Sequence, residues 1–179
     1  KSDYLFLESY LIASPKGMDV CKKALKVAKE NNTKVSISFS DPNIVSAFRS
    51  EIQSLLEIKC DLIFCNEEEA LAYVQTSNLE KAVNSLRGIS PNLLVTQGSS
   101  GCIGFEGKKN IDIAAYKVKA IDTNGAGDMF AGSVLYCLSQ NQSLEDGAKF
   151  GCYTASKVVS HIGPRLSKKE YKEIKNNYS

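Results

Sequence analysis

The segment DTNGAGD at positions 122–128 combines residue types that could do chemistry. Gly125 and Gly127 permit a tight backbone turn and leave amide N–H groups uncovered by side chains. The mostly apolar residues 129–136 predict a helix, so these amides would lie at a helix N-terminus, which favours an anion such as a phosphate. A phosphate normally repels a carboxylate, so Asp128 needs a reason to be there. Accepting the proton of an attacking hydroxyl group is such a reason.

A purely structural interpretation exists for the same segment. It would be a glycine-rich turn between a strand and a helix, with Asp128 complementing the dipole in the first helical turn. Short glycine motifs often occur without a function. The whole segment and its flanks, however, closely resemble the second signature of the PfkB (ribokinase-like) carbohydrate and nucleoside kinases. The resemblance favours a site for phosphoryl transfer.

The resemblance implies a kinase reaction. The γ-phosphoryl group of ATP would pass in line to a primary hydroxyl of a small-molecule sugar or nucleoside, with Asp128 as general base. Backbone amides of Asn124, Gly125, Ala126 and Gly127 would stabilise the developing charge, and Mg2+ would bridge the phosphates. A catalytically inactive nucleotide-binding module with a regulatory role is the alternative. A different α/β nucleotide enzyme is disfavoured, since the sequence has no Walker A motif and no early Gly-x-Gly-x-x-Gly.

Segments 122–132 and 38–42 look most like bacterial adenosine-kinase-like sequences, which favours a nucleoside as the acceptor. The resemblance spans the whole chain but corresponds only to the C-terminal part of the family fold. We therefore expect residues 1–179 to be the C-terminal part of a single ribokinase-like kinase domain, with the N-terminal portion and lid absent. That fragment alone should be inactive, and the full-length enzyme could form a homodimer.

A second glycine motif runs from Thr96 to Gly101 as TQGSSG. On its own it is a β-turn that uses the tolerance of glycine for positive φ. The resemblance places a Thr-x-Gly-x-x-Gly turn here, beside the nucleotide phosphates. Thr96, Gly98 and Gly101 are the residues that match it.

Asn66 and Glu69 stand three residues apart, which is the spacing of a capping box at a helix N-terminus. The resemblance also places an Asn-x-x-Glu motif here, linked to the handling of Mg2+ and phosphate. Both roles are compatible, because the same residues can cap a helix and order metal-bound water.

Three further residues have weaker functional interpretations. Glu8 resembles a carboxylate that reaches the sugar in some ribokinase-like enzymes, and is equally well a polar residue that ends a strand. Asp122 matches a position in the loop for a monovalent cation such as K+. His161, the only histidine, would complement the dipole at a helix C-terminus and is assigned no chemistry.

Strand and helix patterns alternate along the chain, which predicts parallel strands joined by crossover helices. The fold class is thus α/β, a three-layer α/β/α sandwich with a mainly parallel sheet. Strands are expected at 4–7, 35–39, 62–64, 93–95, 102–105, 111–118 and, before the DTNGAGD segment, 116–121. Helices are expected at 18–28, 44–55, from Asn66, at 129–136, from Ala148 to the stop at Gly163-Pro164, and at 168–175.

Composition excludes several classes of partner. A net charge of +2 over 179 residues is too small for a nucleic-acid-binding surface. The apolar, uncharged run 129–144 is too short to span a membrane. The six cysteines form no Cys-x-x-Cys pair, so a zinc site is not expected. We interpret them as reduced thiols of a cytoplasmic protein.

Overall fold

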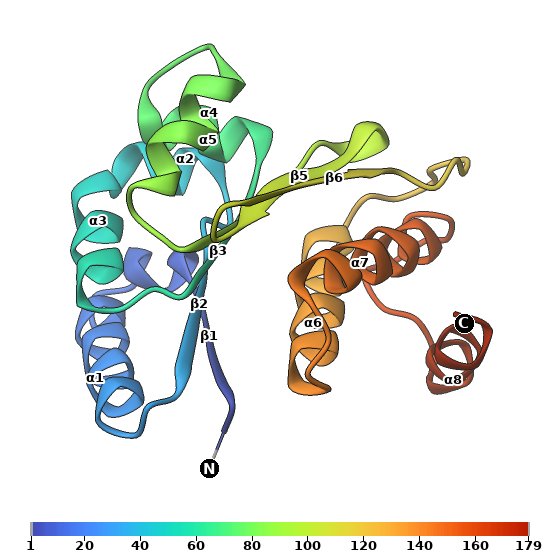
Figure 1. The fold of residues 1–179 in the computed structure, drawn as a ribbon, viewed down its shortest axis with the longest axis horizontal. Coiled ribbons are helices and arrows are strands. Elements are labelled where there is room, and N and C mark those ends of the chain that lie inside the picture. Colours follow the sequence, from blue (N-terminus) through green and yellow to red (C-terminus); the bar gives the residue numbers. More distant parts are fainter. Residues whose placement is uncertain (1, 179) are drawn as a thin grey trace. The chain divides into compact units, whose positions relative to one another are not determined.

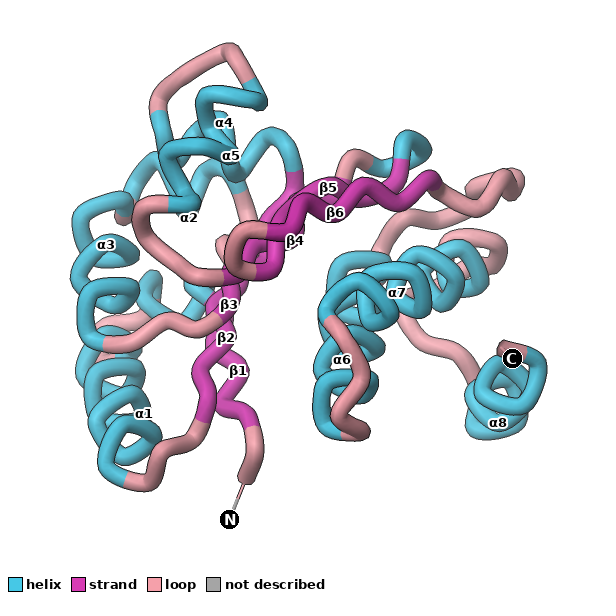
Figure 2. Tube along the Cα trace, viewed as in Figure 1, coloured by secondary structure: helices cyan, strands magenta, loops and turns pink. Residues whose placement is uncertain are grey.

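The computed structural model describes residues 2–178, which form a mixed α/β fold with a six-stranded sheet (Figures 1 and 2). Two compact units divide the described chain. The first contains residues up to 97 together with 103–111, and the second contains 98–102 and the residues from 112 onward.

The first four strands form the parallel part of the sheet. Neighbouring strands follow the chain order, with β1 (Tyr4–Glu8), β2 (Lys34–Ser38), β3 (Leu62–Asn66) and β4 (Asn92–Thr96) paired in parallel. Strands β5 (Gly101–Glu106) and β6 (Lys109–Ala114) follow. Only two residues connect them, so they form an antiparallel hairpin, since a parallel pair needs a long crossover.

Helices follow most of the strands in the order that the sequence predicts (Figure 1). In the first unit they are η1 (Ser9–Ala13, a 3-10 helix), α1 (Gly17–Glu30), α2 (Pro42–Ala47), α3 (Arg49–Ile58), α4 (Glu67–Val74) and α5 (Leu79–Arg87). In the second unit they are the 3-10 helix η2 (Gly98–Ser100), α6 (Ala126–Ser139), α7 (Leu144–Val158) and α8 (Lys168–Asn177). Within residues 2–178, no helix has both the length and the apolar character needed to cross a membrane.

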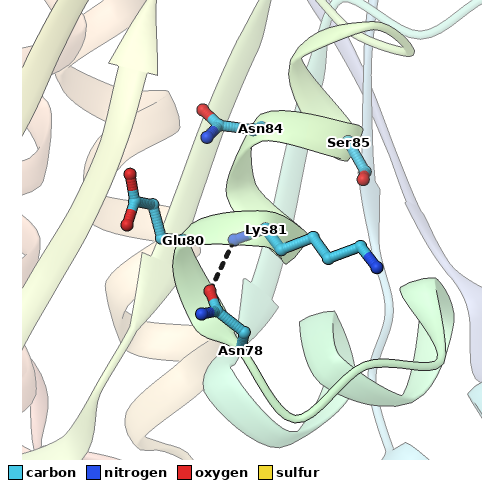
Figure 3. A pocket seen from close by; sticks show the side chains of 5 residues that line it. All are labelled: Asn78, Glu80, Lys81, Asn84 and Ser85. Carbon is cyan, nitrogen blue, oxygen red and sulfur yellow. Dashed lines mark hydrogen bonds between the residues drawn. The ribbon is translucent and has the colours of Figure 1, made fainter.

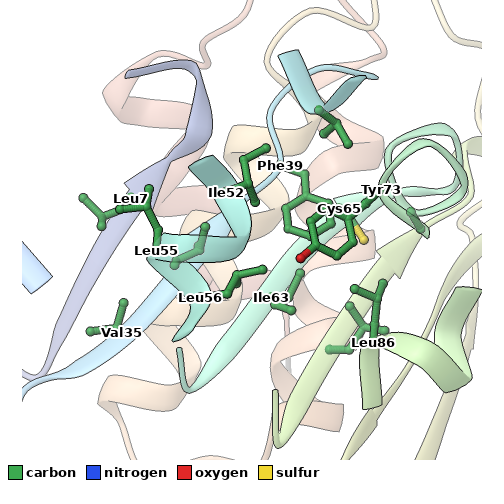
Figure 4. Packing of buried hydrophobic residues seen from close by; sticks show 14 of the residues in the cluster. Leu7, Val35, Phe39, Ile52, Leu55, Leu56, Ile63, Cys65, Tyr73 and Leu86 are labelled. Atoms are coloured by element: carbon green, nitrogen blue, oxygen red, sulfur yellow. The ribbon is translucent and has the colours of Figure 1, made fainter. Parts of the chain in front are cut away.

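The core of the first unit lies between the parallel strands and their helices (Figure 4). Alternate residues of a strand point to one face, and on β2 the pair that enters this core is Val35 and Ile37, both fully buried. Leu55 of α3 and Leu86 of α5 pack into the same cluster. Burial of this apolar surface holds the helices against the strands, and the loops at the strand ends are positioned by that packing.

Polar contacts determine where α2 begins. The Oδ1 atom of Asp41 accepts hydrogen bonds from the amides of Asn43 (2.7 Å) and Ile44 (3.2 Å), and Pro42 occupies the first turn. The expectation of one helix over 44–55 is wrong. Phe48, at φ −124° and ψ 31°, separates α2 from α3.

In the second unit, two glycines of α7 allow close packing on α6. A Cβ atom at Gly151 would lie 2.7 Å from the ring of Phe130, and one at Gly147 would lie 3.2 Å from Val134. The side-chain oxygens of Ser133 and Thr154 form a buried hydrogen bond of 2.8 Å between the same helices. Helix α6, whose first turn contains the last three residues of the DTNGAGD segment, is thus firmly packed against α7.

Three other element predictions need correction. Residues 115–120 have no regular secondary structure, so the strand expected at 116–121 is absent from the described chain and β6 ends at Ala114. Helix α5 was not predicted. Helix α7 ends at Val158, five residues before the glycine that was expected to stop it.

Candidate functional site

Gly125 makes the turn that precedes α6. Its φ is +77°, a conformation that residues with side chains rarely adopt. A Cβ atom at this position would also lie 2.4 Å from the carbonyl oxygen of Pro164. The fold alone therefore requires a glycine at position 125.

Gly127 differs, because nothing in the fold requires it. It lies in the first turn of α6, and a Cβ atom there would meet no atom within 4 Å. The amide of Ala126 bonds to Thr123 (3.3 Å) and that of Met129 to Gly125 (2.9 Å). Between them, the amides of Gly127 and Asp128 have no hydrogen-bond partner among residues 2–178. At this helix N-terminus the residue without a side chain, Gly127, thus lies where the amide donors are unpaired. An anion site would need both features.

Asp128 is the third residue of α6 and its side chain is exposed. No described residue forms a hydrogen bond or an ion pair with its carboxylate. In the first turn the Asp128 carboxylate can complement the helix dipole from where it stands. It does not cap the helix, because the N-cap residue is Gly125. The carboxylate is therefore free to contact a ligand beside the open amides.

The Asp122 carboxylate links the turn before α6 to the loop at Gly163. One carboxylate oxygen accepts from the amide of Asn124 (3.0 Å), and the other accepts from the amide of Gly163 (3.0 Å). These two backbone hydrogen bonds, that of Asn124 first, lower the pKa of Asp122 below its ordinary value. Asp122 thus has a clear structural role, and its predicted contact with a monovalent cation stays a prediction.

The glycines of the second motif also have structural explanations. Gly98 has a φ of +55°, with open space where a side chain would project. Gly101 has a φ of +109°, and a Cβ atom there would lie 2.0 Å from the carbonyl oxygen of Ile113. Positive φ at both positions agrees with the β-turn interpretation. Their contact with nucleotide phosphates stays a prediction.

The capping box at α4 is confirmed. The Oδ1 atom of Asn66 accepts from the amide of Glu69 (2.8 Å), and Glu69 accepts in return from the amide (3.0 Å) and side-chain nitrogen (2.8 Å) of Asn66. Glu69 is only 5% exposed, and burial raises its pKa. Its two oxygens are already engaged, so this pair is suited to ordering metal-bound water rather than to direct metal binding. Residues 2–178 contain no group of three or more acidic, histidine or cysteine side chains that could hold a metal ion.

Parallel pairing brings three predicted residues to the carboxyl ends of the strands, at the same end of the sheet. Glu8, Asn66 and Thr96 are the last residues of β1, β3 and β4, and Asn66 and Thr96 are direct register partners. Loops beyond the carboxyl ends of parallel strands are where open α/β sheets bind ligands. Glu8 is exposed there and makes no side-chain cap to η1.

Apart from Gly98 and Gly101, which lie in a turn of their own, the predicted residues form two groups. One group lies at the carboxyl ends of the parallel strands in the first unit. The other is the turn at 122–128, with Gly163 and Pro164, in the second unit. Sequence reasoning missed Pro164, since only the fold brings it to Gly125. It also treated Gly125 and Gly127 alike.

One surface pocket contains none of the predicted residues. Five residues of α5 and its N-cap line a cavity of about 450 Å3, namely Asn78, Glu80, Lys81, Asn84 and Ser85 (Figure 3). Asn78 caps the helix by accepting from the amide of Lys81 (2.8 Å). Helix capping explains the one polar contact drawn here, so this pocket is not part of the candidate site.

Comparison with known proteins gives a consistent result. The model of the pfkB family carbohydrate kinases matches residues 1–170. Adenosine kinase 2 of Arabidopsis thaliana is 28% identical over 178 residues, covering 89% of this chain and 50% of that protein. The chain thus spans about half the length of the curated relatives it matches.

Solved structures agree on the fold. Adenosine kinase from Sinorhizobium meliloti superposes with a TM-score of 0.93 at 28% identity, covering 98% of this chain and 54% of the other. A putative ribokinase II from E. coli, in complex with ATP and Mg2+, superposes with a TM-score of 0.84 at 20% identity, covering 98% of this chain and 59% of the other. The predicted ribokinase-like α/β fold is confirmed, and the chain belongs to the PfkB family of carbohydrate kinases.

Proposed function

We propose that this chain supplies the phosphate-binding turn and the general base of an ATP-dependent kinase that acts on a sugar or nucleoside. The observation that carries the proposal is the start of α6. Gly127 is not needed by the fold, its amide and that of Asp128 are unpaired, and the exposed Asp128 carboxylate lies directly beside them. Open amides and an acidic residue are common in a first helical turn, so it is their coincidence with a glycine that the fold does not need that favours an anion site.

In the proposed reaction, Asp128 accepts the proton of a primary hydroxyl as its oxygen attacks the γ-phosphorus of ATP. The bond from phosphorus to the β,γ-bridging oxygen breaks, and ADP leaves with that electron pair. The amides of Gly125, Gly127 and Asp128, with the dipole of α6, stabilise the charge on the transferred group. The amides of Asn124 and Ala126, which the sequence also suggested, already donate to Asp122 and Thr123. A positioned general base contributes about 100- to 10,000-fold to such a rate.

Thr96, Gly98 and Gly101 are proposed to border the nucleotide phosphates. Mg2+, when bound, would neutralise charge on those phosphates. Asn66 and Glu69 are proposed to order the water molecules that this cation usually keeps, and not to bind it directly. Asp122 is proposed to support a monovalent cation such as K+ next to the turn.

The acceptor is proposed to be a nucleoside such as adenosine, because the relatives reported above include adenosine kinases. Glu8, exposed at the carboxyl end of β1, is proposed to accept hydrogen bonds from its hydroxyl groups. We further propose a cytoplasmic location, since a chain of this size with a sizeable apolar core does not need a disulfide scaffold, and a homodimer for the whole protein.

An acceptor panel tests the function. ADP release would be measured with adenosine, inosine, ribose and fructose on the whole protein, with and without Mg2+. We expect Mg2+-dependent turnover that is fastest with adenosine. Tight ATP binding without turnover on any acceptor would instead support the inactive regulatory module.

A further inference from the structure

His161 lies in the loop between α7 and α8, and its ring bridges two backbone carbonyl groups. Its Nδ1 atom is 2.6 Å from the carbonyl oxygen of Val158, and its Nε2 atom is 3.1 Å from that of Arg165. Carbonyl oxygens only accept hydrogen bonds, and a neutral imidazole has one N–H donor. Both contacts are therefore hydrogen bonds only when the ring is protonated.

The loop closed by this bridge forms one wall of the turn before α6. The amide of Gly163 donates to Asp122 (3.0 Å), whose other oxygen accepts from Asn124. Pro164 lies against Gly125, in the space that a side chain at position 125 would need. The ring of His161 thus spans the segment that packs directly on the candidate phosphate turn.

Two carboxylates act on the ring. Asp122 precedes α6, and Glu170 lies in the first turn of α8, where Ser167 donates two hydrogen bonds that lower the pKa of Glu170. Both acids stay ionised near neutral pH and favour the protonated imidazole. The carbonyl of Arg165, then that of Val158, raise the pKa of His161 above its ordinary value, and the two carboxylates add to the effect.

We propose that His161 is a positioning residue, whose protonated ring ties Val158 to Arg165 and so holds Gly163 and Pro164 against the phosphate turn. The proposal rests on the proposed function, which makes that turn the phosphate site. Loss of the ring proton removes one hydrogen bond and brings a nitrogen lone pair against a carbonyl oxygen. The Gly163–Pro164 wall then loosens.

The direction of the pH effect follows from the raised pKa. The contribution of the bridge is fully present below the unfolded pKa of about 6.5 and is lost as the pH rises through the higher folded-state value. Phosphate binding should therefore weaken toward alkaline pH. His161→Arg should remove this dependence, since arginine stays charged and offers several donors. His161→Gln should remove the bridge at every pH.

Nuclear magnetic resonance tests the bridge without any assay of activity. Because the chain has a single histidine, its ring signals are unambiguous. We expect two ring N–H groups, a pKa above about 6.5, and amide signals of Gly125, Gly127 and Gly163 that titrate with the ring. A pKa of His161 at or below about 6.5, or glycine amide signals that do not shift as the ring titrates, would overturn the proposal.

Binding of Mg2+–ATP by the three proteins between pH 5.5 and 8.5 then tests the link to function. Loss of one hydrogen bond predicts affinity about 2- to 10-fold weaker for His161→Gln at low pH, where the bridge is intact in the wild type. Equal affinity of all three proteins at every pH would refute the link. If ATP fails to bind while the glycine amides still titrate with the ring, the proposed function fails and the coupling between ring and turn is supported.

Discussion

Replacing Gly127 with alanine separates ligand binding from folding. A Cβ atom at position 127 meets no atom within 4 Å, so the variant should fold without strain. Alanine is favoured over glycine within a helix by about 0.5–1 kcal/mol, so the free energy of unfolding should stay equal or rise. The methyl group would cover amides that we propose bind phosphate. Weakening one hydrogen bond to a charged group costs about 1.5–3 kcal/mol, or roughly 10- to 150-fold in the affinity for ATP.

Two matched variants complete this experiment. Gly132→Ala lies on the same helix, again with nothing within 4 Å, and should raise stability without changing ATP affinity. Gly125→Ala should destabilise the protein by about 1–3 kcal/mol, because it places a side chain at positive φ and against Pro164. Urea denaturation measures stability and titration calorimetry measures affinity. A Gly127→Ala protein with unchanged ATP affinity would refute the proposed role of this glycine.

Two further changes test other parts of the account. Asn66→Ala should lower the free energy of unfolding by about 1–2 kcal/mol in urea denaturation. The change removes the cap of α4 and one hydrogen-bond donor to the buried Glu69 carboxylate. An unchanged denaturation midpoint would contradict the capping role. Residues 1–179 alone should self-associate, because β1 is an apolar edge strand of the described sheet. Leu5→Lys should reduce this self-association in light scattering, at some cost in stability because Leu5 packs against the core. Lys29→Leu on α1 is a control that should not reduce it.

Much of the fold could be predicted from local patterns. Val35, Ile37 and Phe39 alternate with serines, and the strand they predict is β2. The same reasoning fails at 116–121, where the pattern alternates but Tyr116 and Val118 are about half exposed in a loop. A strand exists only if a neighbour accepts its hydrogen bonds, and sequence periodicity does not report a neighbour.

Some missed features did carry a local signal. Leu79, Ala82 and Leu86 recur at helical spacing after Asn78, which caps α5. The break at Phe48 had no such signal, since apolar residues continue at helical spacing through it. Local periodicity therefore predicts that a segment is helical more reliably than it predicts where the helix is interrupted.

The candidate site could be predicted as a set of residues but not as a geometry. The spacing of the glycines, together with the resemblance to PfkB kinases, predicts the turn, its amides and Asp128 as site residues. Only the fold shows that Gly125 is required by Pro164 while Gly127 is not, because position 164 lies far along the chain. The same holds for the bridge made by His161, which depends on a loop that closes back toward Asp122.

The most direct test of the central claim is a single-turnover measurement of phosphoryl transfer from ATP by the whole protein and its Asp128→Asn variant. Asparagine keeps the size of the side chain and makes no demand on the fold at this exposed position. We predict unchanged stability and ATP binding, with a transfer rate lower by about 100- to 10,000-fold, as expected for the loss of a general base. Transfer at the wild-type rate would contradict the assignment of Asp128.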